Sequence, residues 1–268
     1  MKAKRTYKTT SFLSKYIDRF YVVEQSIDNN SGLPPILPGT GLELLFHINI
    51  AVSINSQPLE KGHIVCPRTI SYFDHINNAA FIAVRFKSGA FRHFTSIPFS
   101  ELNDTFISVQ DIWGDKGREL LCKLEHILAI PSKIKEIEKF LLHAFNTYHQ
   151  TKNGKWDTVI HDLYYHFNER TIKEVSDKTK IGLRQFERSF KDQFGITPKA
   201  FQKITRFQDT TKKILLNKNT SYLHEALENG YYDQSHFIKE FKYFANKTPA
   251  KYFSENELDN HFYYKSIK

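Results

Sequence analysis

A sixteen-residue segment occurs twice in this chain, fifty-one residues apart. The first copy is FERSFKDQFGITPKAF (186–201) and the second is FIKEFKYFANKTPAKY (237–252), with five identical positions. In each copy two phenylalanines stand four residues apart, Phe186 and Phe190 or Phe237 and Phe241, so they share one face of a helix. The polar, largely basic side chains fall on the opposite face. The repeat therefore predicts two amphipathic helices, each with an aromatic side to bury.

The same termination signal follows each predicted helix. Gly195 in the first copy and Asn246 at the equivalent place both tolerate the left-handed conformation that ends a helix. A Thr-Pro pair comes next in each copy, beginning at Thr197 and at Thr248. Threonine suits the N-cap and proline the first position of a helix, so a new helix is predicted to begin there.

A further helix is predicted before each copy. Thr171 and Glu174 have the spacing of a capping box, and Ser221 stands fifty residues after Thr171, which gives the second copy one extra turn residue. A helix, a short turn and a second helix with a polar face make a helix-turn-helix. Between the two copies, residues 203–218 have the apolar spacing of one helix of about a dozen residues, roughly 20 Å long. The second half of the chain is therefore predicted to be two joined helix-turn-helix motifs.

The first half of the chain has the shorter period of β-strands. Residues 42–55 (LELLFHINIAVSIN) alternate as one half-buried strand, and 63–73 and 79–86 read similarly. Residues 115–130 and 132–148 then change to helical spacing, and the polar segment 149–155 follows. The prediction is an α+β protein: an antiparallel β-domain (a small barrel or cupin-like) at 1–150, with strands in 20–86 and helices in 116–148, then an all-α domain at 156–256.

Composition favours a polyanionic partner. The net charge is +9, and residues 184–213 carry eight basic side chains against three acidic ones. The two cysteines, Cys66 and Cys122, have no metal-type spacing and are typical of a reducing compartment. No apolar run is long enough to cross a bilayer, and the N-terminus lacks the apolar core of a secretory signal. We expect a cytoplasmic protein with no membrane partner.

On these residues, the segment 156–253 resembles the DNA-binding domain of the AraC/XylS family of bacterial transcription regulators. The resemblance is carried by ERSFKDQFGITPKAF, by the linker around Arg206, and by NGYYDQSHFIKEFK followed by KTPAKYF. The segments LPGTGLELLF and VRFKSGAFRHFTSIPFSELND resemble, more loosely, the sensor half of some such regulators. The resemblance implies two recognition helices that enter neighbouring major-groove segments of double-stranded DNA.

The resemblance also implies which residues contact DNA. Those that would read bases are Arg184, Glu187 and Arg188 from the first recognition helix, and Gln234, Ser235, His236 and Lys239 from the second. Their chemistry suits the task, because Arg can bond guanine, Gln can bond adenine, and Glu can accept from the cytosine amino group. Thr197 and Thr248, at helix starts, are expected to contact phosphates through backbone N–H groups.

The sequence departs from the family pattern at three positions. Lys180 replaces the usual glycine of the first turn and Gly182 replaces the usual serine, which predicts a weaker cap for that recognition helix. Glu225 occupies an apolar position in the second motif, where Leu223 and Leu227 are candidates to take over the packing.

The expected function is a sequence-specific DNA-binding transcription regulator, without enzymatic activity and without a cofactor. Its expected partners are double-stranded DNA, a small effector in the N-terminal domain and RNA polymerase, and a homodimer, if formed, is expected to be held by residues 1–150. One alternative is a metal-dependent cupin-like enzyme using His47, His63 and His75, although no compact ligand spacing joins these histidines. A second alternative is a DNA-packaging protein without sequence preference.

One apolar stripe has two interpretations. Ile134, Ile137, Leu141 and Phe145 fall on a single face of the helix predicted at 132–148. This face either forms a dimer contact or packs on the β-domain of its own chain.

Overall fold

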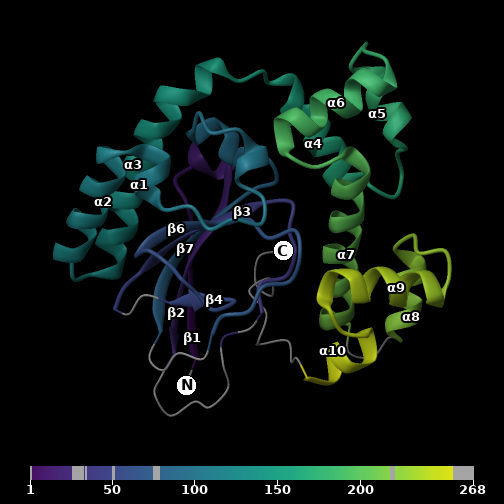
Figure 1. Cartoon of the computed structure of the whole chain (residues 1–268), viewed down its shortest axis with the longest axis horizontal. Helices are drawn as coiled ribbons and strands as arrows, with labels where there is room; N and C mark the ends of the chain where they lie inside the picture. The colour runs from purple at the N-terminus through teal and green to yellow at the C-terminus, as the bar shows by residue number, and fades with distance from the viewer. Residues whose placement is uncertain are drawn as a thin grey trace. The chain divides into compact units, whose positions relative to one another are not determined.

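The computed structural model describes residues 2–25, 33, 35–49, 52–74, 79–217 and 221–255. These residues divide into two compact units (Figure 1). Unit 1 comprises Met1–Leu33, Gly41–Cys66 and Phe73–Gly154, and unit 2 comprises Pro34–Thr40, Pro67–Tyr72 and Lys155–Lys268. The long stretch of unit 2 begins within the polar segment 149–155. Two short segments from the first half of the chain also belong to unit 2.

Unit 1 is built on an antiparallel sheet. The strands are β1 (Lys2–Tyr7), β2 (Ile17–Gln25), β3 (Leu42–His47), β6 (Gly62–Val65) and β7 (Ala80–Phe86), in the order β1-β2-β7-β3-β6. A separate two-stranded sheet pairs β4 (Ser53–Ile54) with β5 (Gln57–Pro58). Short 3-10 helices are η1 (Leu13–Lys15), η2 (Ala90–Phe94), η3 (Phe99–Glu101) and η4 (His149–Thr151). The predicted order, an antiparallel β-domain followed by a helical domain, is confirmed.

The prediction of a single strand at 42–55 is wrong. β3 ends at His47, and Ser53–Ile54 pairs with a different strand. The His47 Nδ1, at the end of β3, accepts a hydrogen bond from the Val52 amide at 2.9 Å. Val52 and Ile54 are buried although β3 has ended, so the alternation of apolar residues continues where the strand does not.

One face of the sheet packs against helices. Phe20, Val84, Leu44 and Ile64 lie side by side on four adjacent strands, and each is fully buried. The helices α1 (Val109–Trp113), α2 (Asp115–His126) and α3 (Ile130–Tyr148) are grouped on one side of the sheet (Figure 1) and share its hydrophobic core. The helices predicted in 116–148 are confirmed, and α1 is an addition.

The apolar stripe of α3 belongs to this core. Ile134, Ile137, Leu141 and Phe145 are all buried in unit 1. The interpretation of the stripe as a dimer contact is therefore wrong, because the β-domain of the same chain already covers it.

The opposite face of the sheet carries a buried polar network. The Tyr21 hydroxyl donates to one oxygen of Glu43 at 2.6 Å, and Arg85 donates to the other oxygen at 2.7 Å. Burial, and then the charge of Glu43, raise the pKa of Tyr21 well above its ordinary value, so the phenol remains a neutral donor. Polar groups on this face are thus paired with each other.

Unit 2 is helical. Its elements are α4 (Lys155–Tyr165), α5 (Ile172–Lys178), α6 (Leu183–Phe194), α7 (Pro198–Leu216), α8 (Tyr222–Glu228), α9 (Gln234–Ala245) and α10 (Pro249–Glu255). The predicted terminators adopt the left-handed conformation, with φ of 72° at Gly195 and 53° at Asn246. Through the described part of the chain, no helix is both long and apolar enough to cross a membrane.

His63 is a fully buried histidine on β6. Its Nδ1–H donates to the Glu60 carbonyl at 3.0 Å, while its buried Nε2 has no hydrogen-bond partner among the described residues. Burial lowers the pKa of His63 to about 4, which keeps the ring neutral in the folded protein.

We predict that this histidine makes the protein less stable as pH falls. The unfolded chain binds a proton near pH 6.5 and the folded chain only near 4, so the free energy of unfolding should decrease between these values by up to about 1.4 kcal/mol per pH unit. Urea unfolding at pH 6.5, 5.5 and 4.5 would measure the slope. His63→Gln should flatten it, whereas His143→Gln, at an exposed position of α3, should not. Equal slopes in all three proteins would contradict the prediction.

Candidate nucleic-acid interface

A single helix, α7, joins two separate aromatic cores. Phe201 belongs to the core of the first helix-turn-helix, where its ring meets Phe190 at 5.8 Å. Phe207, six residues later, belongs to the core of the second, where its ring meets Phe241 at 5.2 Å. α7 has 19 residues and so extends about 28 Å, longer than the dozen residues predicted. The distance between the two motifs is thus set by one continuous helix.

The first helix-turn-helix consists of α5, a turn at 179–182 and α6. Thr171 and Glu174 form the predicted capping box, and its hydrogen bonds lower the pKa of Glu174. Lys180 adopts a left-handed φ of 58°, the conformation for which glycine is usual. Gly182 is the N-cap of α6 and makes no side-chain cap bond. The weaker cap predicted for this recognition helix is confirmed.

The second helix-turn-helix consists of α8, a turn at 229–233 and α9, and its turn is one residue longer, as predicted. Gly230 supplies the left-handed residue, with φ of 84°. Asp233 is the N-cap of α9 and accepts from the His236 amide at 2.7 Å. A carboxylate also stabilises a helix N-terminus electrostatically. The second recognition helix therefore has the stronger cap.

Glu225 is accommodated by a hydrogen bond. Its side chain is buried, and Asn217, just after α7, donates to its Oε1 at 2.9 Å. Leu227 is 44% exposed, so the suggestion that it takes over the packing at this position is wrong. The carboxylate instead joins α8 to the end of the connecting helix.

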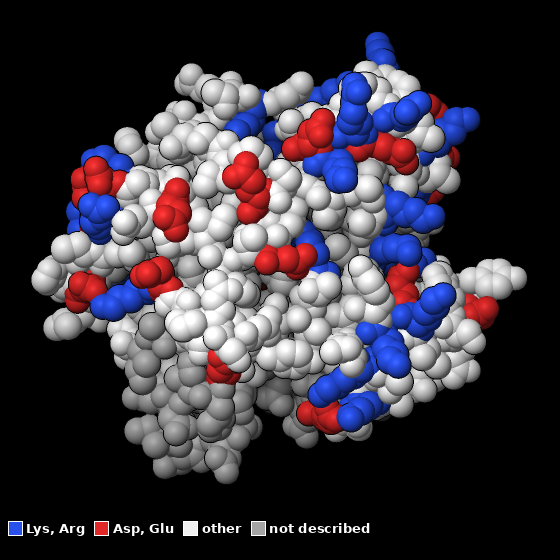
Figure 2. Space-filling view, in the orientation of Figure 1, with Lys and Arg blue, Asp and Glu red and all other residues white. Residues whose placement is uncertain are grey.

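The side chains expected to read bases lie at the surface of the two recognition helices. Those that are exposed are Arg184, Glu187, Arg188, Gln234, Ser235 and Lys239. They stand on the helices whose aromatic faces, Phe186 with Phe190 and Phe237 with Phe241, are completely buried. Figure 2 shows Lys and Arg side chains gathered over the helices of unit 2 on the face in view. Each recognition helix thus has one buried aromatic side and one free polar side.

His236 differs from the other candidates. Its Nδ1 accepts from the Tyr232 amide at 3.3 Å, and its Nε2 lies 3.7 Å from Glu240. Both ring nitrogens thus face groups of its own motif, an arrangement that holds the turn against α9. A role for His236 in reading bases stays a prediction.

Two exposed residues, one on α6 and one just before α9, were missed at the sequence level. Tyr232, directly before the N-cap of α9, is 88% exposed, and Gln185 accepts a hydrogen bond from Arg188. A phenol placed at a helix start could donate to a phosphate. The signal was available in the sequence, because Tyr231 and Tyr232 are adjacent and a short turn can bury only one of them.

Arg206 joins α7 to the second motif. Its guanidinium donates to both oxygens of Glu240 on α9, at 2.7 and 2.8 Å, and to the Gly230 carbonyl at 3.1 Å. It also lies over the Tyr231 ring, 4.3 Å from the centroid. Nearby, Asn229 donates to Thr210 of α7 at 2.7 Å. The turn and the recognition helix are therefore both attached to the connecting helix.

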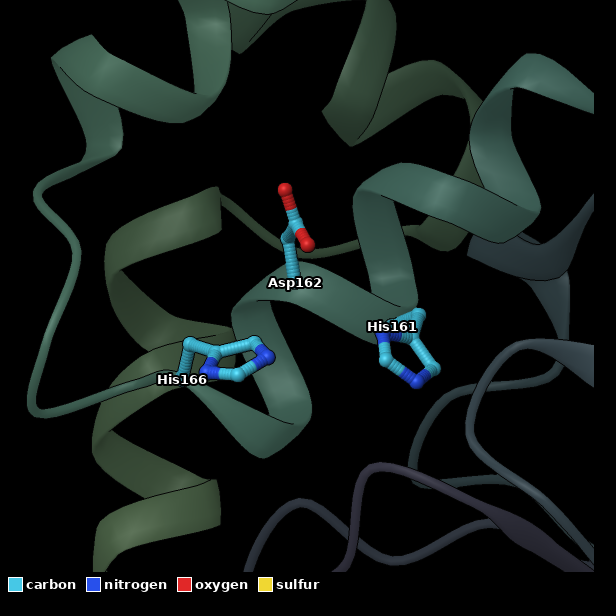
Figure 3. Close-up of side chains that lie close together, drawn as sticks. All are labelled: His161, Asp162 and His166. Carbon is cyan, nitrogen blue, oxygen red and sulfur yellow. The ribbon is translucent and has the colours of Figure 1, made fainter.

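One cluster on α4, ahead of the first motif, has the residue types of a metal site. Ligand atoms of His161, Asp162 and His166 lie within 4.8 Å of one another at the end of α4 (Figure 3). Burial alone would raise the pKa of Asp162, but hydrogen bonds from Lys178 and Arg170, at 2.7 and 2.5 Å, outweigh it and lower that pKa. Both carboxylate oxygens are thus paired with side-chain cations. We interpret the cluster as an ion-pair centre that joins α4 to α5.

Two helix-turn-helix motifs on one connecting helix, each with an exposed polar recognition face, define unit 2 as a DNA-binding domain. In agreement, residues 175–255 match the helix-turn-helix domain family, and this part of the chain is an AraC-type helix-turn-helix domain. Residues 5–108 match a domain family of unknown function (DUF6597). No curated protein sequence matches the chain.

Among solved structures, the fold is similar to that of ToxT from Vibrio cholerae. A 1.65 Å structure of ToxT is 10% identical, with a TM-score of 0.48 over 87% of this chain and 96% of that one. ToxT with a bound unsaturated fatty acid is 8% identical, with a TM-score of 0.45 over 92% and 96%.

We predict that Arg206→Met destabilises unit 2 by about 3 kcal/mol, because it leaves the buried Glu240 carboxylate without its main partner. Urea unfolding of the whole chain would measure the loss. Lys203→Met is the matched control, since Lys203 is 46% exposed and lies 3.8 Å from Glu240; its effect should stay below about 1 kcal/mol.

The double variant Arg206→Met with Glu240→Met should be more stable than Arg206→Met alone, because no charge is then left buried and unpaired. A double variant less stable than the single one would show that the ion pair is not the source of the effect.

Proposed function

We propose that this protein is a sequence-specific DNA-binding transcription regulator that reads two neighbouring major-groove segments with one chain. The observation that carries the proposal is the equivalent placement of Arg188 and Lys239. Each lies exposed on a recognition helix, opposite a buried pair of phenylalanines, on motifs held apart by α7. Major grooves on one face of DNA recur every ~34 Å, so two readers at a fixed separation suit this target.

The two recognition helices, α6 and α9, are proposed to contact different parts of one DNA site. Arg184, Glu187 and Arg188 would contact bases in one groove segment, and Gln234, Ser235, His236 and Lys239 would contact those in the next. Thr197 and Thr248 would lie near the phosphates, since each caps a helix by accepting from a backbone amide, at 3.1 and 3.4 Å. Tyr232 is added to the phosphate contacts because of its exposure.

Unit 1 is proposed to respond to a small effector. It contains a cavity of about 330 Å³ beside α2 and α3, at the lower end of the size range of small-molecule sites. A homodimer through residues 1–150, contact with RNA polymerase and a cytoplasmic location complete the proposal. None of these roles requires the first unit to be an enzyme. Three histidines belong to the metal-enzyme alternative. The ring centroids of His47 and His63 lie 4.9 Å apart, and His75 lies outside the described residues.

We predict that Arg188→Ala and Lys239→Ala alter different parts of one asymmetric DNA site. The affected base pairs should be centred about 10 base pairs apart, one turn of the duplex. Loss of a bidentate contact by Arg188 should cost about 1–3 kcal/mol and relax preference at its position. We expect Lys239 to have the smaller effect and to act in part on a phosphate. A scan of all single-base changes in a selected site, against wild type and both variants, measures this.

Lys116→Met serves as the control for loss of one positive charge, because Lys116 lies in unit 1 and pairs with Glu119. If Arg188→Ala and Lys239→Ala changed preference at the same base pairs, the proposed division of the site would be wrong.

We also predict strong salt dependence. Every phosphate neutralised by Lys or Arg releases counterions, so log affinity should fall against log salt with a slope of about −0.9 per contact. Fluorescence anisotropy between about 50 and 200 mM salt would test this with selected and random duplexes. A flat plot would contradict docking through the basic face, and equal affinity for both duplexes would favour the DNA-packaging alternative.

A further inference from the structure

Two short segments from the first half of the chain contribute to the core of the second helix-turn-helix. They are residues 35–40 and 67–72, here called the strap, and both belong to unit 2. Leu37 is 2% exposed and lies in the same hydrophobic core as Phe207 of α7 and the buried phenylalanines of α9. Ile70, from the other segment, packs against that core. The second motif is therefore assembled from parts of the chain that are distant in sequence.

The two segments of the strap are bonded to each other. The Ile36 amide donates to the Ser71 carbonyl at 2.8 Å, and the Ser71 amide donates back at 3.0 Å. The Gly39 amide donates to the Pro67 carbonyl at 3.1 Å, and the buried guanidinium of Arg68 donates to the Gly39 carbonyl. The strap is thus a short antiparallel ladder, and its apolar side chains are presented to the core from a hydrogen-bonded backbone.

The second motif is the less apolar of the two at equivalent positions of the repeat. In α4, Val159 and Ile160 are buried in the first core. The equivalent positions of α7, fifty-one residues later, hold Thr210 and Thr211, which are buried as well. Glu225 is a further buried polar residue at a position where the first motif is apolar. Burial of polar side chains yields less hydrophobic stabilisation, so the apolar side chains of the strap add what the repeat itself lacks at these positions.

The two recognition helices therefore depend on different parts of the chain. The buried residues of the first core, as far as the structure describes them, all come from 156–201. The second core combines the strap with α7, α8, α9 and α10. Phe237 and Phe241 attach α9 to this core and are fully buried. Because cores are close-packed, a change in the strap is felt by the helix that packs on the same core.

We propose that the strap positions the second recognition helix, so that base reading by α9 depends on the first half of the chain, whereas base reading by α6 does not. Leu37 is a positioning residue in this proposal, because it acts on α9 through the core that they share. The inference deepens the proposed function and rests on it for the division of one DNA site between two helices. The strap leads directly into β3 and follows directly from β6, so this dependence is built into the covalent chain.

Hydrogen exchange on the whole chain tests the positioning without DNA. Leu37→Ala should accelerate exchange of the α9 amides at least about tenfold and leave the α6 amides within about twofold, because local opening follows local packing. Leu163→Ala is the matched control at a fully buried position of the first core, and it should show the reverse pattern. Leu37→Met nearly conserves the side-chain volume and should keep α9 within about threefold of wild type.

A milder variant keeps the test decisive if Leu37→Ala does not fold. Ile70→Ala shortens a partly buried side chain of the strap and should also accelerate exchange in α9 but not in α6. Thr69→Ala, at the exposed neighbouring position, is its control and should leave both helices unchanged.

The second measurement is the scan of single-base changes in a selected DNA site. Each strap variant should relax preference at the base pairs altered by Lys239→Ala and preserve preference at those altered by Arg188→Ala. A general loss of folded protein would instead weaken binding to all sequences alike. Equal acceleration of α6 and α9, no acceleration of either, or equal loss of preference in both parts of the site would overturn the inference. Selective acceleration of α9 in a chain without base preference would keep the positioning role of the strap and overturn the proposed function.

Discussion

The arrangement of the DNA-binding half depends on the membership of α7 in two hydrophobic cores. Phe201 is buried with the aromatic residues of the first motif, and Phe207 with those of the second. Because both belong to one continuous helix, neither motif can shift along α7 without pulling an aromatic ring out of its core. The repeat in the sequence thus corresponds to two copies of one packing solution, joined by an element that both share.

The two motifs are nevertheless attached to the rest of the domain by different forces. The first relies on rings, with Trp156 of α4 contacting Phe186 and Phe190, and on the ion-pair centre at Asp162. The second adds a polar attachment, in which Arg206 bonds both the turn and the recognition helix. Apolar packing tolerates small adjustments, whereas bidentate hydrogen bonds fix an orientation. The Arg206 guanidinium thus fixes the orientation of α9 directly against α7.

Local signals in the sequence predicted much of this domain. Gly195, Asn246 and the Thr-Pro pairs act within a few residues of themselves, so the ends of the helices could be read directly. The pairs Arg206–Glu240 and Asn217–Glu225 could not be predicted, because periodicity places a residue on a face and does not identify its partner on another helix. The same limit explains the stripe of α3, which looks identical whether it meets the chain's own sheet or a second copy.

In the β-domain, alternation of apolar residues does not show where a strand ends, so a single strand was predicted at 42–55 although β3 ends at His47. The strap was equally hidden, since a leucine outside any predicted element is unremarkable in sequence until Leu37 is found in the core of the second motif.

The membership of residues 34–40 and 67–72 in unit 2 has a topological consequence. Ile36 and Ser71 pair as a β-bridge between these segments, and Leu37 is buried with Phe207 in the core of the second motif. Each segment continues directly into unit 1, one into β3 and the other from β6, which are neighbours in the sheet. The chain thus passes from one unit to the other five times rather than once. Proteolysis at the polar segment near Gly154 would cut one of the five chain connections between the units and leave four. The two fragments of the nicked protein should therefore still migrate together under native conditions and separate only after denaturation.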